Sequence, residues 1–236
     1  FGNALTLDST DFLDYLARDG ETEIIAMYLE GVKDGRRLLD LTTEVNRKKP
    51  VIIYKGGLTE SGARAVSSHT GSLAGGEKIW QAFFRQSGAT PVDSLEEMAD
   101  AVQAFHHLKT SPGPRTTVLG IGGGIGVYVA DSCARAGLSL PALSPGLIRD
   151  LRTLIPPAGT MIRNPIDAVV AFINLPVMGE ILHLLAQSRE IDNFIVSLPL
   201  DWLFDKGDGG SYIQTVATYL AEEARRHTAG MPLVVV

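Results

Sequence analysis

The chain alternates along its whole length between short apolar segments of strand length and longer amphipathic segments of helix length. The runs 24–29 and 51–54 are continuously apolar and the run 193–198 is mostly apolar, which is typical of strands buried on both faces of a parallel sheet. Segments such as 34–48 and 211–226 carry apolar residues at helical spacing. This alternation predicts an α/β protein with mainly parallel sheets packed between helices in three layers.

A length of 236 residues and a turn-forming segment near the middle indicate two domains. We place the first domain at 1–110, a linker at 111–115 and the second domain at 116–236. The chain ends on the apolar run Pro232–Val236, so we expect the second domain to be truncated at its C-terminus. Each half contains a strand–helix–strand crossover ending in a strand that begins with proline. Two flavodoxin-like domains fit this pattern, and one continuous large sheet is the alternative.

Composition excludes several classes of function. The net charge of −6 gives no basic surface for nucleic acid. No apolar run reaches the length needed to cross a membrane, and no signal-peptide pattern opens the chain. The single cysteine, Cys133, excludes an internal disulfide and fits the reducing cytoplasm.

The most distinctive segment sets a single histidine, His69, among small hydroxylated residues and glycines at 67–75. Glycines let backbone N–H groups approach an anion, hydroxyls add donors, and a helix starting here would offer its positive end. An imidazole in this setting can be a nucleophile towards phosphorus as well as a base. A structural or simply exposed histidine is the alternative. The candidate phosphate ligands beside His69 are Ser68, Thr70, Gly71 and Ser72.

A second glycine cluster, Gly120–Gly126, lies between an apolar strand and a helix predicted over 125–136. It fails the dinucleotide-binding fingerprint, because the third glycine position falls on Ile125 or Val127 and no acidic residue ends the next strand. It also lacks the Lys-Ser/Thr pair of a P-loop. NAD is disfavoured, whereas phosphate or a phosphoryl group remains open, with tight strand–helix packing as the alternative. The candidate anion ligands are Gly123, Gly124, Ile125 and Gly126.

Glu30 closes the first apolar strand, where open α/β sheets place their functional groups. A carboxylate there can accept a hydrogen bond from one imidazole nitrogen, leaving the other nitrogen free to attack phosphorus. A solvated loop carboxylate is the alternative. We expect Asp34 to cap a helix, and the turn Asn164–Asp167 to serve either function or turn stability. No histidine has partners spaced as metal ligands, so we predict no metal site.

Three segments closely resemble the NDP-forming acyl-CoA synthetases, which belong with succinyl-CoA synthetase in one superfamily. They are YLEGVKDG at 28–35, KGGLTESGARA at 55–65 and SSHTGSLAG at 67–75. The segments 122–127 and 164–167 are similar to the second glycine loop and the Asn-Pro-x-Asp turn of the same enzymes. The resemblance covers essentially the whole chain and implies the two central flavodoxin-like domains of such an enzyme.

The resemblance also implies a reaction. These enzymes interconvert an acyl-CoA, phosphate and ADP or GDP with the free acid, CoA and ATP or GTP. An acyl phosphate forms first, and a histidine then takes the phosphoryl group and passes it to the nucleotide. His69 matches the phosphorylated histidine, and Glu30 matches the glutamate that steadies it. The amino ends of two helices, one following His69 and one following Gly126, would hold the phosphate.

The partners implied are an acyl-CoA or carboxylic acid, CoA, phosphate, and ATP or ADP with Mg²⁺ in an ATP-grasp unit. We expect no tightly bound cofactor in this chain, but an N-terminal CoA-binding domain, the ATP-grasp unit and an oligomeric assembly as its partners. Some relatives carry a fused acetyltransferase domain, often with the histidine replaced. The alternative function is therefore an acyl-CoA or phosphate sensor for such a domain, although the retained His69 favours the synthetase.

Overall fold

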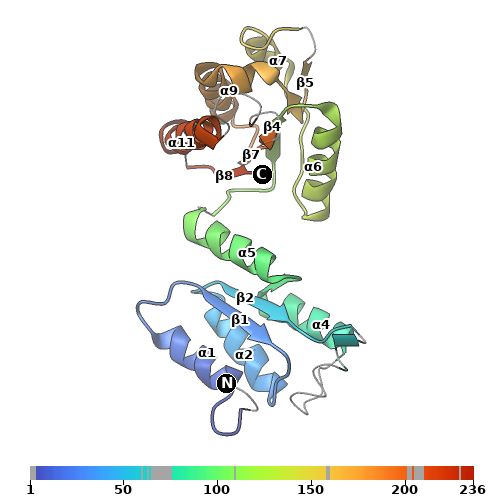
Figure 1. Cartoon of the computed structure of the whole chain (residues 1–236), viewed down its shortest axis with the longest axis vertical. Helices are drawn as coiled ribbons and strands as arrows, with labels where there is room; N and C mark the ends of the chain where they lie inside the picture. Colours follow the sequence, from blue (N-terminus) through green and yellow to red (C-terminus); the bar gives the residue numbers. More distant parts are fainter. Residues whose placement is uncertain are drawn as a thin grey trace. The chain divides into compact units, whose positions relative to one another are not determined.

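The computed structural model consists of two compact units, Phe1–His107 and Leu108–Val236, each with its own sheet (Figure 1). The structure describes residues 4–59, 61–62, 64, 76–108, 110–157, 160–200, 204, 210–228 and 230–236. None of the helices in these ranges is long and apolar enough to cross a membrane.

The first unit is built on a parallel sheet of three strands in the order β1 (Ile25–Leu29), β2 (Val51–Lys55) and β3 (Thr90–Val92). Figure 1 shows α5 (Leu95–His107) on one face of this sheet and the other helices on the opposite face. Those helices are α1 (Ser9–Arg18), α2 (Gly35–Val45) and α4 (Glu77–Ser87). In the register of the sheet Leu29 lies beside Lys55, so β1 and β2 end together.

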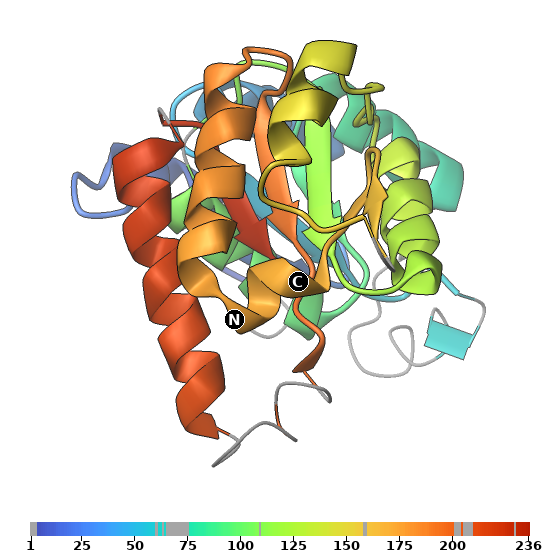
Figure 2. The same cartoon turned by 90° about the horizontal axis from the view of Figure 1, so that it is seen from above.

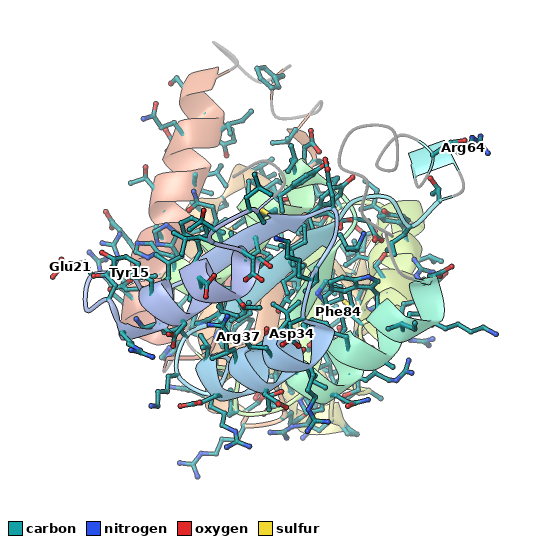
Figure 3. The ribbon with its side chains drawn as sticks, turned by 90° about the horizontal axis from the view of Figure 1, so that it is seen from below. Tyr15, Glu21, Asp34, Arg37, Arg64 and Phe84 are labelled. Carbon is teal, nitrogen blue, oxygen red and sulfur yellow. The ribbon has the colours of Figure 1, made fainter. Side chains whose placement is uncertain are left out.

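Helix α2 begins at a capping residue that the sequence predicts. The carboxylate of Asp34 accepts a hydrogen bond of 2.9 Å from the N–H of Arg37, which confirms Asp34 as the cap of α2. Arg37 then forms an ion pair of 2.9 Å with Asp11 of α1. Figure 3 shows Asp34 and Arg37 together at the start of α2. The core between these helices and the sheet includes Leu13, Ile25, Leu38, Ile53, Trp80 and Phe83.

The second unit has a sheet of five strands in the order β5-β6-β4-β7-β8. All pairs are parallel except β5–β6, which confirms the mainly parallel α/β prediction. The strands are β4 (Thr116–Gly120), β5 (Met161–Ile162), β6 (Ile166–Asp167), β7 (Asn193–Val196) and β8 (Leu233–Val235).

Helices cover both faces of this second sheet, as Figure 2 shows. On one face α6 (Gly123–Arg135) packs Val129 and Cys133 against Val118 of β4. The opposite face carries the larger core, which includes Leu119, Phe172 and Leu182. The helices on that face are α7 (Pro145–Leu151), α8 (Val169–Ile173), α9 (Leu175–Gln187) and α11 (Gly210–His227).

Two local features differ from the sequence prediction. The segment 164–167 is more than a turn, because Ile166 and Asp167 form β6 and pair with β4. A strand of two residues is too short to show an alternating pattern, so the sequence carried no signal for it. In addition, α6 begins at Gly123 rather than at 125. Glycine has a low helix propensity, and here the helical turn forms despite it.

Candidate functional site

In the first unit, Glu30 directly follows β1 at the carboxyl end of the parallel sheet and is half-buried. The hydroxyl of Tyr28 donates a hydrogen bond of 3.2 Å to Oε1 of Glu30. Residues two apart on an extended chain lie on the same side, which places the phenol and the carboxylate together. Burial and the neighbouring carboxylate raise the pKa of Tyr28, so its hydroxyl keeps its proton and remains a donor.

Lys55 closes β2 beside Glu30, and only 6% of its surface is exposed. Its Nζ donates to the main-chain carbonyl oxygen of Glu30 at 2.7 Å and also to that of Gly56. The ammonium lies 5.4 Å from the centre of the Trp80 ring on α4, within the range of a cation–π interaction. Burial lowers the pKa of Lys55, and the negative charge of Glu30 acts in the opposite direction.

In the second unit, the glycine cluster forms the connection between β4 and α6. Gly122 precedes the helix with a φ of 90°, in the left-handed region that favours glycine. The N–H of Gly126 donates to the carbonyl oxygen of Gly122 at 3.2 Å. The N–H groups of Gly123, Gly124 and Ile125 have no acceptor among the described residues, as expected for the first turn of a helix. These three amides are available to an anion.

Two side chains from the segment 164–167 support this connection. Oδ1 of Asp167 accepts a hydrogen bond of 3.0 Å from the N–H of Gly122. The side chain of Asn164 accepts from the N–H of Val118 at 3.1 Å and donates to the carbonyl oxygen of Thr116 at 2.7 Å. Asn164 therefore fixes β4 from the side, whereas Asp167 fixes the loop that follows it.

A cavity of about 170 Å³ adjoins the amino end of α6. Its walls are mostly apolar, and its polar side chains are those of Asp131, Asp167 and Ser197. Within the residues that the structure describes, no three His, Cys, Asp or Glu side chains lie close enough to bind a metal ion together.

The predicted site residues divide into two groups. His69 and its neighbours Ser68, Thr70, Gly71 and Ser72 lie outside the described residues. Glu30 is described in the first unit, and Gly123–Gly126 in the second.

Sequence reasoning missed Tyr28 and Lys55 as neighbours of Glu30. Two signals were present: Tyr28 lies two residues before Glu30 on the same strand, and Lys55 is a charged residue ending an otherwise apolar strand. It also left the purpose of Asn164 and Asp167 open, because their partners lie more than 40 residues away in sequence.

Comparison with known proteins assigns the class of this fold. Residues 1–105 match the family model described as the succinyl-CoA ligase like flavodoxin domain. A solved structure of acetyl-coenzyme A synthetase 1 from Ca. Korarchaeum cryptofilum, in complex with phosphate and ADP, is similar with a TM-score of 0.77 and 29% identity. That match covers 97% of this chain and 48% of the other.

Curated relatives extend this result beyond the first unit. The alpha subunit of acetate–CoA ligase (ADP-forming) II from Pyrococcus furiosus is 42% identical over 72% of this chain and 37% of its own length. Acetate–CoA ligase (ADP-forming) I from Archaeoglobus fulgidus is 39% identical over 81% of this chain and 27% of its own length. The chain thus spans about a third of the length of these relatives. It belongs to the family of ADP-forming acyl-CoA synthetases, as its sequence motifs indicated.

Proposed function

We propose that this chain carries the phosphohistidine relay of an ADP-forming acyl-CoA synthetase. Phosphate displaces CoA from the acyl-CoA and forms an acyl phosphate. A nitrogen of His69 then attacks phosphorus, the bond from phosphorus to the acyl oxygen breaks, and the carboxylate leaves. The phosphoryl group finally passes from His69 to ADP, which gives ATP and restores the imidazole. Each step is reversible.

The observation that carries this proposal is the position of Glu30. It lies at the carboxyl end of a parallel strand, the edge at which α/β proteins bind their ligands, in the unit whose sequence contains His69. Its Oε1 is hydrogen-bonded to Tyr28, and Oε2 has no donor among the described residues. A carboxylate with one open oxygen can accept an imidazole N–H and stabilise the charge that develops on the ring.

We assign phosphate-binding groups to both units. In the first, the hydroxyls of Ser68, Thr70 and Ser72 and the backbone at Gly71 surround His69 in sequence. In the second, the candidate donors are the free amides at the start of α6. Gly126 belongs to the same helical turn, although its own N–H is bonded to the carbonyl oxygen of Gly122. The second-unit ligands are Gly123, Gly124, Ile125 and Gly126.

The remaining components of the cycle lie outside this chain. The substrates are a carboxylic acid or its acyl-CoA, CoA, phosphate, and ADP or ATP. The nucleotide binds with Mg²⁺ in an ATP-grasp unit, and CoA binds in an N-terminal CoA-binding domain. The assembled enzyme is an oligomer in the cytoplasm.

The test is covalent labelling of the full-length enzyme with radiolabelled ATP and Mg²⁺. We expect acid-labile phosphohistidine in the wild type and none in His69→Ala. His107→Ala is the matched control, because His107 is an exposed histidine at the end of α5 in the same unit. Unchanged labelling of His69→Ala would disprove the relay. Absence of labelling in the wild type would favour the alternative of a non-catalytic sensor.

The role of Glu30 has its own test. In Glu30→Gln the carboxylate charge is lost while the shape and an acceptor oxygen remain, so we expect slower labelling of His69, by about 10²-fold. The fold should be retained, because the side chain is only half-buried. Equal labelling rates in Glu30→Gln and the wild type would exclude this role.

A further inference from the structure

Two residues that have no role in the proposed relay hold Glu30, each at a different group. Tyr28 bonds its carboxylate, and Lys55 bonds its main-chain carbonyl. The two residues come from neighbouring strands, Tyr28 from β1 and Lys55 from the end of β2. A structural bond between strands would explain Lys55 alone, but it would not explain a phenol directed at the carboxylate of the same residue.

The direction of the Tyr28 hydroxyl is fixed although 53% of the residue is exposed. Its ring stacks on that of Tyr54 with 5.3 Å between centroids and 17° between planes. Gly56 leaves the space that the hydroxyl occupies, since a Cβ at Gly56 would lie 3.2 Å from the phenolic oxygen. An exposed tyrosine would normally rotate freely, whereas the stacked ring of Tyr54 confines this one and Gly56 leaves room for its hydroxyl.

Lys55 fixes the other end of the residue. Its ammonium bonds the carbonyl oxygens of Glu30 and Gly56 and lies over the Trp80 ring, so the buried charge is compensated mainly by dipoles and the indole face. These contacts tie the peptide after β1 to the peptide after β2. With its carbonyl held and its Oε1 bonded, Glu30 has little freedom to turn.

We propose that Tyr28 and Lys55 are positioning residues that hold the Glu30 carboxylate in the orientation needed to accept the N–H of the His69 imidazole. Neither residue touches the phosphoryl group; both act through Glu30. A carboxylate oxygen can accept more than one hydrogen bond, so the bond from Tyr28 leaves the capacity that His69 needs. This inference rests on the proposed function.

The first experiment uses Tyr28→Phe in the full-length enzyme, which removes the hydroxyl and keeps the stacked ring. We expect the initial rate of His69 labelling from radiolabelled ATP and Mg²⁺ to fall about three- to tenfold, with the KM for ATP unchanged. Tyr15→Phe is the control, because Tyr15 is a 70% exposed tyrosine on α1 of the same unit. A labelling rate for Tyr28→Phe equal to that of Tyr15→Phe would overturn the role of Tyr28.

The second experiment tests whether both residues act through Glu30. Residues that act through a common partner show non-additive effects. We therefore expect Lys55→Met and Tyr28→Phe to slow labelling in the wild-type background, but by less than about twofold in Glu30→Ala. Equal losses in the two backgrounds would show a general structural effect and overturn the inference. If the wild type itself is not labelled at His69, the proposed function fails first, and this inference with it.

Discussion

The two units carry different groups at the carboxyl ends of their parallel strands. In the first unit the carboxyl ends of β1 and β2 carry ionisable side chains, Glu30 and Lys55, with a phenol directed at one of them. In the second unit the carboxyl end of β4 leads into free main-chain amides at the start of α6. Asp167 of the neighbouring strand is bonded to the loop itself, through the N–H of Gly122.

Under the proposed function, this difference matches a division of roles in which the first site carries the phosphoryl group and the second binds it as an anion. A site that carries a phosphoryl group covalently needs groups that gain or share protons and that point in one direction. A site that only holds an anion is served by amides, which carry a fixed partial charge and do not titrate. Side-chain chemistry should therefore decide the behaviour of the first site, and backbone conformation that of the second.

Among the variants that separate the two units, Asn164→Ala is expected to change the free energy of unfolding most. The Asn164 side chain makes four hydrogen bonds, including one of 3.2 Å to the carbonyl oxygen of Pro141. Their loss should lower the free energy of unfolding of the second unit by about 2–4 kcal/mol, because backbone groups of β4 lose their partners. Hydrogen exchange in increasing urea, read separately for each unit, measures this.

The control for Asn164→Ala is Asn174→Ala. Asn174 is exposed, and its side chain makes no capping hydrogen bond at the start of α9. We expect a change within about 0.5 kcal/mol there. If Asn164→Ala lowered the free energy of unfolding of the first unit as much as that of the second, the two sites would not be stabilised independently.

Alanine substitutions at two adjacent glycines of the second site should change the free energy of unfolding by smaller amounts and in opposite directions. Gly122→Ala should destabilise by about 1–2 kcal/mol, because an L-residue is strained at a φ of 90°. Gly123→Ala should stabilise by about 0.5 kcal/mol through helix propensity. A Cβ at either position meets no heavy atom within 4 Å, so backbone conformation alone sets the sign. Urea midpoints of the two variants that shift in the same direction would contradict this.

The fold was predictable because apolar strand segments and amphipathic helix segments alternate repeatedly along the sequence. Continuous apolar runs such as 51–54 and amphipathic helices such as α2 gave the parallel α/β class without any long-range information. Strand β6 was missed, since its two residues gain their strand geometry only from pairing with β4. Tertiary contact, not local preference, makes Ile166 and Asp167 a strand.

The candidate site was predictable where a residue type is chemically unusual for its surroundings. Glu30 stood out as a carboxylate ending an apolar strand, and the glycine cluster as a run between a strand and a helix. Tyr28 and Lys55 could not be assigned in the same way, because the contacts that define them are a stacked ring from β2 and carbonyl groups of the residues that follow β1 and β2. Those contacts depend on the register of β1 and β2, which no single segment encodes.

The charge of Asp167 offers a third and weaker test of the second site. Asp167→Asn keeps an oxygen acceptor for the N–H of Gly122 but removes a negative charge from the cavity beside the free amides. Under the proposed function, we expect the KM of the full-length enzyme for phosphate to fall by about two- to fivefold, because less repulsion opposes the anion. The stability should change by less than about 1 kcal/mol.

The comparison variant for Asp167→Asn is Asp150→Asn, an exposed carboxylate on α7. It should leave the KM for phosphate unchanged. A higher KM for phosphate in Asp167→Asn would mean that the carboxylate assists the site beyond fastening the loop, and the second site could then not be described by its amides alone.

The smallest expected effect is a pH dependence of the free energy of unfolding that arises only from Lys55 in the first site. Burial lowers the pKa of Lys55, so the unfolded chain holds the Lys55 proton more tightly than the folded chain does. Between the lowered pKa of the folded state and the ordinary lysine value of about 10.4, the unfolded state therefore binds more protons, and the stability of the wild type rises with pH in that window. Lys55→Met removes the titrating group. The stability of the wild type relative to Lys55→Met should increase between about pH 8 and about pH 10.

Urea unfolding at both pH values measures this slope, with Lys48→Met, which replaces an exposed lysine, as the baseline. The loss caused by Gly122→Ala should be the same at both pH values, because the strain at that position involves no proton. A slope for Lys55→Met no different from that of Lys48→Met would mean that the Lys55 ammonium is as well solvated as a surface lysine. The first site would then lack the buried charge that distinguishes it from the second.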